Sequence, residues 1–98
     1  MVKHIFMAPI KEGANDEKIE EMMDFMRTLK ADVPEIETQI VARNTGWAGI
    51  ANAVTMVIDL KDKAALDSLM GSAAHTAVAA RAGEVFDINE FIVSQIEY

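Results

Sequence analysis

The segment from Val2 to Ala8 constrains the fold most strongly, because it is an extended stretch whose two faces both avoid water. At the two-residue period of a β-strand, one face carries Val2, His4, Phe6 and Ala8, and the other carries Lys3, Ile5 and Met7. A strand that is largely apolar on both faces belongs in the middle of a sheet. Each face therefore needs a cover, and one of the faces carries a histidine.

The length and composition indicate one compact domain that spans residues 1–98. Hydrophobic residues make up 51% of the chain, enough for a genuine core, although a chain this short gains stability from burying surface against a partner. There is no cysteine, which excludes disulfides, thiolate nucleophiles and cysteine metal sites.

The formal net charge of −7 argues against nucleic-acid binding, because an acidic surface repels a phosphate backbone. No apolar run approaches the roughly 20 residues that a membrane-spanning helix needs, so no membrane association is expected. The N-terminus lacks the apolar region and cleavage site of a signal peptide. The expected location is the cytoplasm.

A long amphipathic helix is predicted from Asn15, which can cap it, to Val33, where Pro34 ends it. Its apolar residues recur at helical spacing, namely Ile19, Met22, Met23, Met26, Leu29 and Val33. The methionines on this face have two interpretations. They either fill the core adaptably or form part of a soft ligand pocket.

Two strands are expected next, at 36–45 and 53–60. In the first, Ile36, Thr38, Ile40 and Ala42 alternate with Glu37, Gln39, Val41 and Arg43, which predicts a half-buried strand. The second is apolar on both faces, like the first strand of the chain. The loop between them contains the only tryptophan, Trp47, which we expect either to anchor the loop or to pack on a partner subunit, with stacking on a ligand as the alternative.

Two short helices and a last strand complete the pattern. Asp62 and Gly71 delimit the first helix, and Ser72 and Gly83 delimit the second. The last strand is expected at 90–98, where apolar residues alternate again.

The element order β-α-β-β-α-(α)-β predicts an α+β, ferredoxin-like fold: a four-stranded antiparallel sheet in the order 4-1-3-2, with the helices on one face. In this order the first and third strands are central, and these are the two strands that are apolar on both sides. The helices leave the other face bare, including Ile5 and Met7. An apolar surface of this kind marks an interface, so we predict a two-fold homodimer whose sheets pack face to face.

His4 and His75 are the only side chains that titrate near neutral pH without perturbation. Each lies on an apolar stripe, where a histidine is either a satisfied core residue or a functional group. If the His4 face is the one that the helices cover, both histidines line one cavity. His75 lies in the first turn of its helix, and both the helix dipole and burial favour the neutral imidazole, as a general base requires.

Other kinds of site find no support in the sequence. Two histidines far apart in the chain do not make a metal-ligand motif, so no metal is predicted. No glycine-rich phosphate loop and no Gly-x-Ser-x-Gly elbow is present, and no cofactor is expected.

Three segments resemble the stress-responsive dimeric α+β barrel (Dabb) family: Met1 to Phe6, Asp62 to Leu69, and Ala74 to Arg81. The resemblance covers essentially the whole chain and implies a homodimer with a cavity between sheet and helices. The family includes polyketide cyclases such as olivetolic acid cyclase, in which a histidine of the first strand and one of the third helix act in the pocket. Here His4 and His75 match those two histidines.

The chain departs from the family pattern at three places. Leu69 stands where the cyclases have a tyrosine, and Ser72-Ala73-Ala74-His75 stands where the family often has His-Pro-Ala-His. Asn52 stands where an aspartate commonly opens the third strand. The missing tyrosine removes a polar partner from the expected chemistry.

The principal functional prediction is that this barrel binds a small apolar or aromatic molecule, with Phe6, Met26, Leu69 and Val78 as ligand contacts. The alternative is a cofactor-independent cyclase or lyase in which His75 abstracts a proton and His4 orients the substrate. Two further hypotheses are a cofactor-free monooxygenase, by fold analogy, and an assembly protein without an occupied cavity. A role in stress is implied by the resemblance alone.

Overall fold

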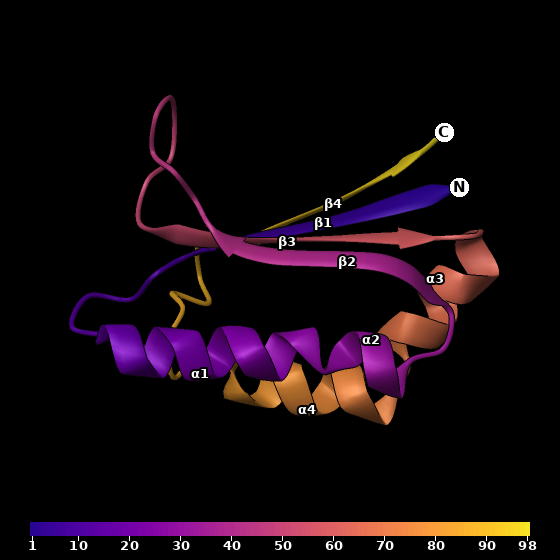
Figure 1. The fold of residues 1–98 in the computed structure, drawn as a ribbon, viewed down its shortest axis with the longest axis horizontal. Coiled ribbons are helices and arrows are strands. Elements are labelled where there is room, and N and C mark those ends of the chain that lie inside the picture. Colours follow the sequence, from indigo (N-terminus) through magenta and orange to yellow (C-terminus); the bar gives the residue numbers. More distant parts are fainter.

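The computed structural model describes residues 1–98 and shows one sheet covered on one side by helices (Figure 1). The order of the elements is the predicted one. The strands are β1 (Val2–Pro9), β2 (Ile36–Arg43), β3 (Ala53–Leu60) and β4 (Ile92–Glu97), and the helices are α1 (Asp16–Arg27), α2 (Leu29–Asp32), α3 (Lys63–Met70) and α4 (Ala73–Ala82).

The sheet is antiparallel with the order β2-β3-β1-β4, which confirms the predicted topology. The two strands with two apolar faces, β1 and β3, are central. The register aligns residues in rows across all four strands. His4 pairs with Ile58 on one side and Gln95 on the other, and Phe6 pairs with Met56 and Val93.

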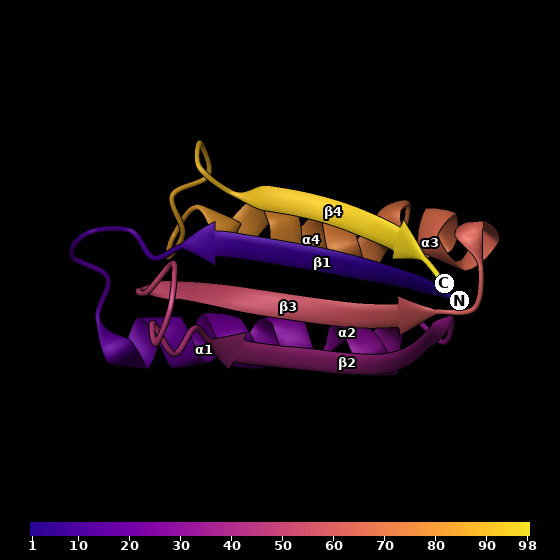
Figure 2. The ribbon, with the colours of Figure 1, turned by 90° about the horizontal axis from the view of Figure 1, so that it is seen from above.

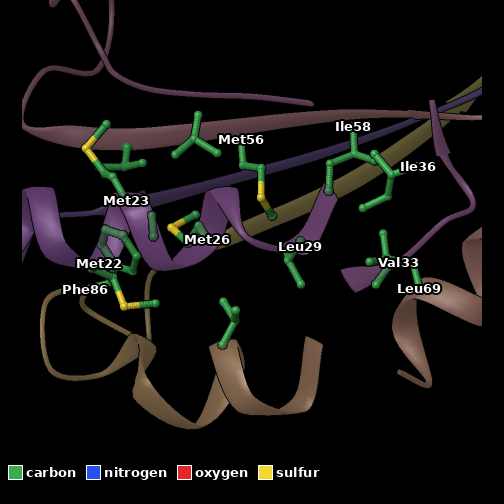
Figure 3. Packing of buried hydrophobic residues seen from close by; sticks show 14 of the residues in the cluster. Met22, Met23, Met26, Leu29, Val33, Ile36, Met56, Ile58, Leu69 and Phe86 are labelled. Atoms are coloured by element: carbon green, nitrogen blue, oxygen red, sulfur yellow. The ribbon is translucent and has the colours of Figure 1, made fainter. Parts of the chain in front are cut away.

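All helices lie on one face of the sheet, which we call the inner face. Figure 2 shows α1 and α2 beneath β2 and β3, and α4 beneath β1 and β4. The core lies between these layers, where Met22, Met26 and Leu29 of the α1–α2 segment meet Met56 and Ile58 of β3 (Figure 3). The prediction that Val2, His4, Phe6 and Ala8 face the helices is confirmed by their burial or by their contact with this core.

The three predicted helix caps are confirmed. The side chains of Asn15, Asp62 and Ser72 each accept a hydrogen bond from the backbone N–H three residues ahead, at 2.8 to 3.1 Å. Each cap pairs a backbone donor that the first helical turn leaves without a partner.

The predicted continuous helix to Val33 is wrong at one position, Thr28, where α1 ends and α2 begins. The Thr28 hydroxyl donates to the carbonyl of Phe25 at 2.6 Å and competes with the regular helical pattern. The nearby carbonyl of Met26 accepts a hydrogen bond from the Gln39 side chain of β2 at 2.8 Å. The interruption is therefore stabilised by a strand that lies far ahead in the sequence.

The predicted faces of β2 also need a correction. Ile36 is buried, but Ile40, expected on the same face, is 64% exposed on the other side. The register shifts between Ile36 and Thr38, as in a β-bulge. A bulge inserts one residue and moves all later side chains to the opposite face. This shift turns Val41 toward the core and Ile40 toward the bare face of the sheet.

No helix is both long and apolar enough to cross a membrane. The face of the sheet opposite the helices, the outer face, carries no element of the chain, and only the loop from Asn44 to Asn52 rises on that side (Figure 1).

Candidate functional site

A cavity of about 440 Å³ lies between the sheet and the helices. Fourteen of its sixteen lining residues are hydrophobic, and the two others are the histidines. The lining consists of His4, Phe6, Ala8, Met22, Met26, Leu29, Met56, Met70, His75, Val78, Ala79, Ala82, Phe86, Ile88, Phe91 and Val93. Its size falls within the range of small-molecule pockets, roughly 300–1,000 Å³.

The cavity exists because the two halves of the helical layer differ in side-chain size. On the α1–α2 side, Met22, Met26 and Leu29 reach the sheet and are almost completely buried. On the α4 side, the wall consists of short side chains such as Ala79 and Ala82. Alanines at helical spacing leave unfilled space beneath β1 and β4.

His4 is held in the floor of the cavity by β1 and is only 2% exposed. Its Nδ1 atom lies 2.9 Å from the Nε2 atom of Gln95, its neighbour on β4. Burial lowers the pKa of His4 below the usual 6.5, and the nearby His75 lowers this pKa further. The neutral imidazole is therefore the stable form at neutral pH.

The contact with Gln95 selects a tautomer of His4. The Gln95 amide nitrogen can only donate, so Nδ1 of His4 accepts and the ring proton resides on Nε2. The tautomer of His4 thus follows from the orientation of the Gln95 side-chain amide, whose nitrogen faces Nδ1. His4 then presents a hydrogen-bond donor to the cavity, where a carbonyl, hydroxyl or enolate oxygen can accept.

His75 enters the cavity from the opposite wall, at the start of α4. Its backbone N–H donates to the Ser72 hydroxyl at 3.1 Å, which fixes the first turn of the helix. The half-buried imidazole makes no hydrogen bond within the protein, and burial lowers its pKa below 6.5. A neutral ring without a partner can accept a proton or a hydrogen bond from a bound molecule.

The two histidines, 71 residues apart in the sequence, thus line the same cavity, as we expected if the His4 face met the helices. The charged form of His75 disfavours a second charge on His4, so His75 acts together with burial to lower the pKa of His4. No cluster of three or more histidine or acidic side chains could hold a metal ion.

Three of the four expected ligand contacts, Phe6, Met26 and Val78, line the cavity. The fourth, Leu69, does not. It is completely buried in the core on the inward side of α3, and its neighbour Met70 lines the cavity instead. The helical rotation of about 100° per residue separates the directions of these two side chains.

Sequence reasoning missed two parts of the site. Gln95 stood on the same face as Phe91 and Val93, but its pairing with His4 required the register between β1 and β4. Phe86 and Phe91 were not assigned to the site, yet their rings lie 6.2 Å and 6.0 Å from the ring of Phe6. The sequence signal that could have found them is their position, since both phenylalanines lie close together just before the last strand.

The model of the stress responsive A/B barrel domain matches residues 2–94. The search of curated proteins finds no match.

Solved structures share the fold across the entire chain. A dimeric ferredoxin-like protein of unknown function from Thermobifida fusca has a TM-score of 0.85 at 16% identity, covering 99% of this chain and 90% of that one. A protein from Arabidopsis thaliana has a TM-score of 0.83 at 20% identity, covering 100% and 95%. A structure described as an antibiotic biosynthesis monooxygenase has a TM-score of 0.75 at 17% identity, covering 100% and 98%. At such identities the likeness shows the fold alone.

Proposed function

This chain belongs to the stress responsive A/B barrel domain family, and from that premise we propose that it is a homodimeric protein that binds a small apolar or aromatic molecule. The observation that carries the proposal is the cavity, whose apolar lining is interrupted only by His4 and His75. Such a cavity selects a ligand that is mostly hydrocarbon and carries one polar group.

The histidines supply the polar end of the site. His4 donates through Nε2, and the His75 ring is free to accept, so a phenol or a carbonyl compound finds a partner for its oxygen. Both imidazoles are neutral at pH 7, because burial lowers their pKa values. A neutral site imposes no requirement for an anionic ligand. Phe6, Met26 and Val78 would contact the ring or chain of the ligand.

The proposed homodimer uses the outer face of the sheet. Apolar side chains there are largely exposed, among them Ile40 of β2 and Ile92 and Ile96 of β4. An apolar surface without a cover indicates an interface. The solved structures with this fold include several described as dimeric, which supports the same arrangement.

Binding is tested with naphthol as a fluorescent probe and with naphthalene, which lacks the hydroxyl. We expect naphthol to bind more tightly than naphthalene, and His75→Phe to reduce that preference by about tenfold, the equivalent of one hydrogen bond of about 1.4 kcal/mol. Ala79→Phe fills the cavity and should abolish binding. Ala80→Phe, at the next position of the same helix and outside the cavity lining, is the matched control. Equal binding of naphthol by the Ala79→Phe and Ala80→Phe variants would refute the assigned site.

An enzymatic function is the second candidate, and the presence of two neutral histidines in the lining of one cavity favours it. His75 would take a proton from the carbon beside a carbonyl, and His4 would donate a hydrogen bond to the enolate oxygen. The proton returns to the carbon when no further step follows. Cofactor-free oxygenation stays a prediction that rests on the shared fold.

Proton abstraction is tested with acetophenone in deuterium oxide. We expect deuterium to enter its methyl group, as followed by NMR, at a rate that depends on the protein. His75→Gln should abolish this exchange, and His4→Gln should slow it. Binding of naphthol together with exchange no faster than in buffer would leave the binding function standing and exclude the enzymatic one.

A further inference from the structure

The loop from Asn44 to Asn52, which we call the Trp47 arm, exposes large apolar side chains to solvent. Trp47 is 90% exposed, and Ile50 is about half exposed. Tryptophan is among the residues that contribute most to protein interfaces when it is buried there. An indole presented to water in this way suggests a docking element.

The arm has a defined conformation. The Asn44 side chain accepts a hydrogen bond from the Thr55 hydroxyl and donates to the carbonyl of Ile50 at 3.1 Å, which fastens both ends of the arm. Gly46 has φ +72°, and a Cβ atom there would lie only 2.8 Å from the Cβ of Ala51. The backbone therefore crosses itself closely at a position that only glycine tolerates.

The direction of the arm matches the proposed interface. In Figure 1 it rises from the ends of β2 and β3 on the side opposite the helices, above the outer face. Any copy of the chain that packs on this face lies beside the arm.

Charges on the outer face define how a second copy is oriented. Lys3 of β1 and Asp59 of β3 pair with each other in the register and form a salt bridge at 2.8 Å. A two-fold axis parallel to the strands, between β1 and β3, places β1 of one copy over β3 of the other. Each Lys3 then faces the Asp59 of the partner. A two-fold axis in the same plane but perpendicular to the strands places Lys3 over an uncharged residue such as Met7, and Asp59 over one such as Thr55. Burying these charges without an opposite charge across the interface is unfavourable.

The same axis places the arm on the partner. It brings the β2–β3 side of one copy over the β1–β4 side of the other, with corresponding strand ends together. The arm adjoins the end of the sheet where Met7 pairs with Thr55 and Ile92. The start of β4 in the second copy lies at that end, directly after the half-exposed Phe91.

We propose that the Trp47 arm of each protomer docks on the second copy at Phe91, where it adds Trp47 to the mouth of the partner's cavity. The occupant of this surface is thus a second copy of the chain. The proposal rests on the homodimer of the proposed function, and it extends the site, because Phe91 lines the cavity and contacts Phe6.

Trp47 is the only tryptophan, so its fluorescence reports its own environment. We expect emission at shorter wavelength and protection from acrylamide at concentrations where sedimentation shows a dimer. Dilution to the monomer should restore the emission of an exposed indole. The variant Val57→Asp, which places a charge in the middle of the outer face, supplies a monomeric reference at high concentration.

The position of the arm is tested by a double-mutant cycle on the dimer dissociation constant. Trp47→Ala and Phe91→Ala should each raise this constant about tenfold or more, and the double variant should raise it by less than the product. Met70→Ala is the control, because Met70 lines the cavity from α3, and its effect should be independent of Trp47.

Each other result overturns a defined part of the proposal. A monomer at micromolar concentration refutes both the dimer and the docking. A dimer whose tryptophan is as accessible as in Val57→Asp refutes the docking and leaves the dimer standing. A protected tryptophan whose effect is independent of Phe91 refutes the position at the cavity mouth.

Discussion

The two faces of the sheet differ although the same strands form both. On the inner face, alternate residues such as Ile58 and Leu60 are completely buried against the helices. On the outer face, their neighbours Val57 and Asp59 are only partly covered. The inner face completes its burial within one chain, whereas the outer face stays open to the second copy that we propose. The comparison teaches that the two apolar faces of one strand can meet different fates, one closed by the helices of its own chain and one left bare.

The inner face is itself divided. Long side chains of α1 fill the space beneath β3, and the alanines of α4 leave a cavity beneath β1 and β4. The histidines lie in the part that is not filled. The same sheet face therefore contributes both to the stability of the protomer and to the candidate site.

The strongest test of the comparison uses two adjacent residues of β3. Ile58→Asp places an unpaired charge in the core, and we expect a loss of about 4 kcal/mol or more, enough to unfold the domain. Val57→Asp on the outer face should preserve the fold and abolish the dimer. Circular dichroism and sedimentation distinguish the two outcomes. A folded Ile58→Asp protein would show that the inner face is not the core.

A smaller effect is expected at the pair of Gln95 and His4. Gln95→Glu places a carboxylate at Nδ1, which then carries the proton, and the pKa of His4 should rise by about one unit, or about 1.4 kcal/mol. Nitrogen NMR of the imidazole measures the tautomer and the titration. Gln95→Leu is the control that removes the hydrogen bond without adding charge. An unchanged tautomer in Gln95→Leu would contradict the role assigned to Gln95.

The pH dependence of stability follows from the histidines. Their pKa values are lower in the folded chain than the 6.5 of the unfolded chain, so the unfolded chain binds protons first as the pH falls. The free energy of unfolding should therefore decrease as the pH falls below about 6.5, until the folded pKa values are passed.

Denaturation in urea at about pH 7.5 and about pH 5 measures this loss, and replacing both histidines by asparagine should reduce it. Asp59 does not contribute in this range, because its usual pKa of 3.8 already lies below it, and hydrogen bonds from Lys3, Thr38 and Tyr98 lower that pKa to about 2 in the folded chain. If the variant without both histidines still lost as much stability between these two pH values as the wild type, other titrating groups would be responsible for the loss.

The smallest effect is expected at Thr38 on the outer face, whose hydroxyl donates to Asp59 at 2.6 Å. Thr38→Val removes one exposed hydrogen bond, and the free energy of unfolding should change by no more than about 1 kcal/mol. Urea denaturation of the monomeric Val57→Asp background provides the measurement. A much larger loss would show that the outer face stabilises the protomer by itself.

Much of the fold was predictable because local signals agreed with one another. The two-faced apolar pattern of 2–8 and 53–60 identified the central strands, and the caps at Asn15, Asp62 and Ser72 located the helices. The errors at Thr28 and Ile40 have a common origin. The helix interruption and the β-bulge are linked through the hydrogen bond from Gln39 to Met26, a contact between distant segments that periodicity does not show.

The candidate site was predictable only in part. The sequence by itself determined that both histidines lie on apolar faces, and that a sheet with helices on one side would leave the other side bare. The tertiary structure decided that Met70 lines the cavity rather than Leu69, that Gln95 orients His4, and that Trp47 rises on the bare side. Alternation and helical period define the direction of each side chain within its own element. Register, bulges and the packing of one element on another determine which side chains meet.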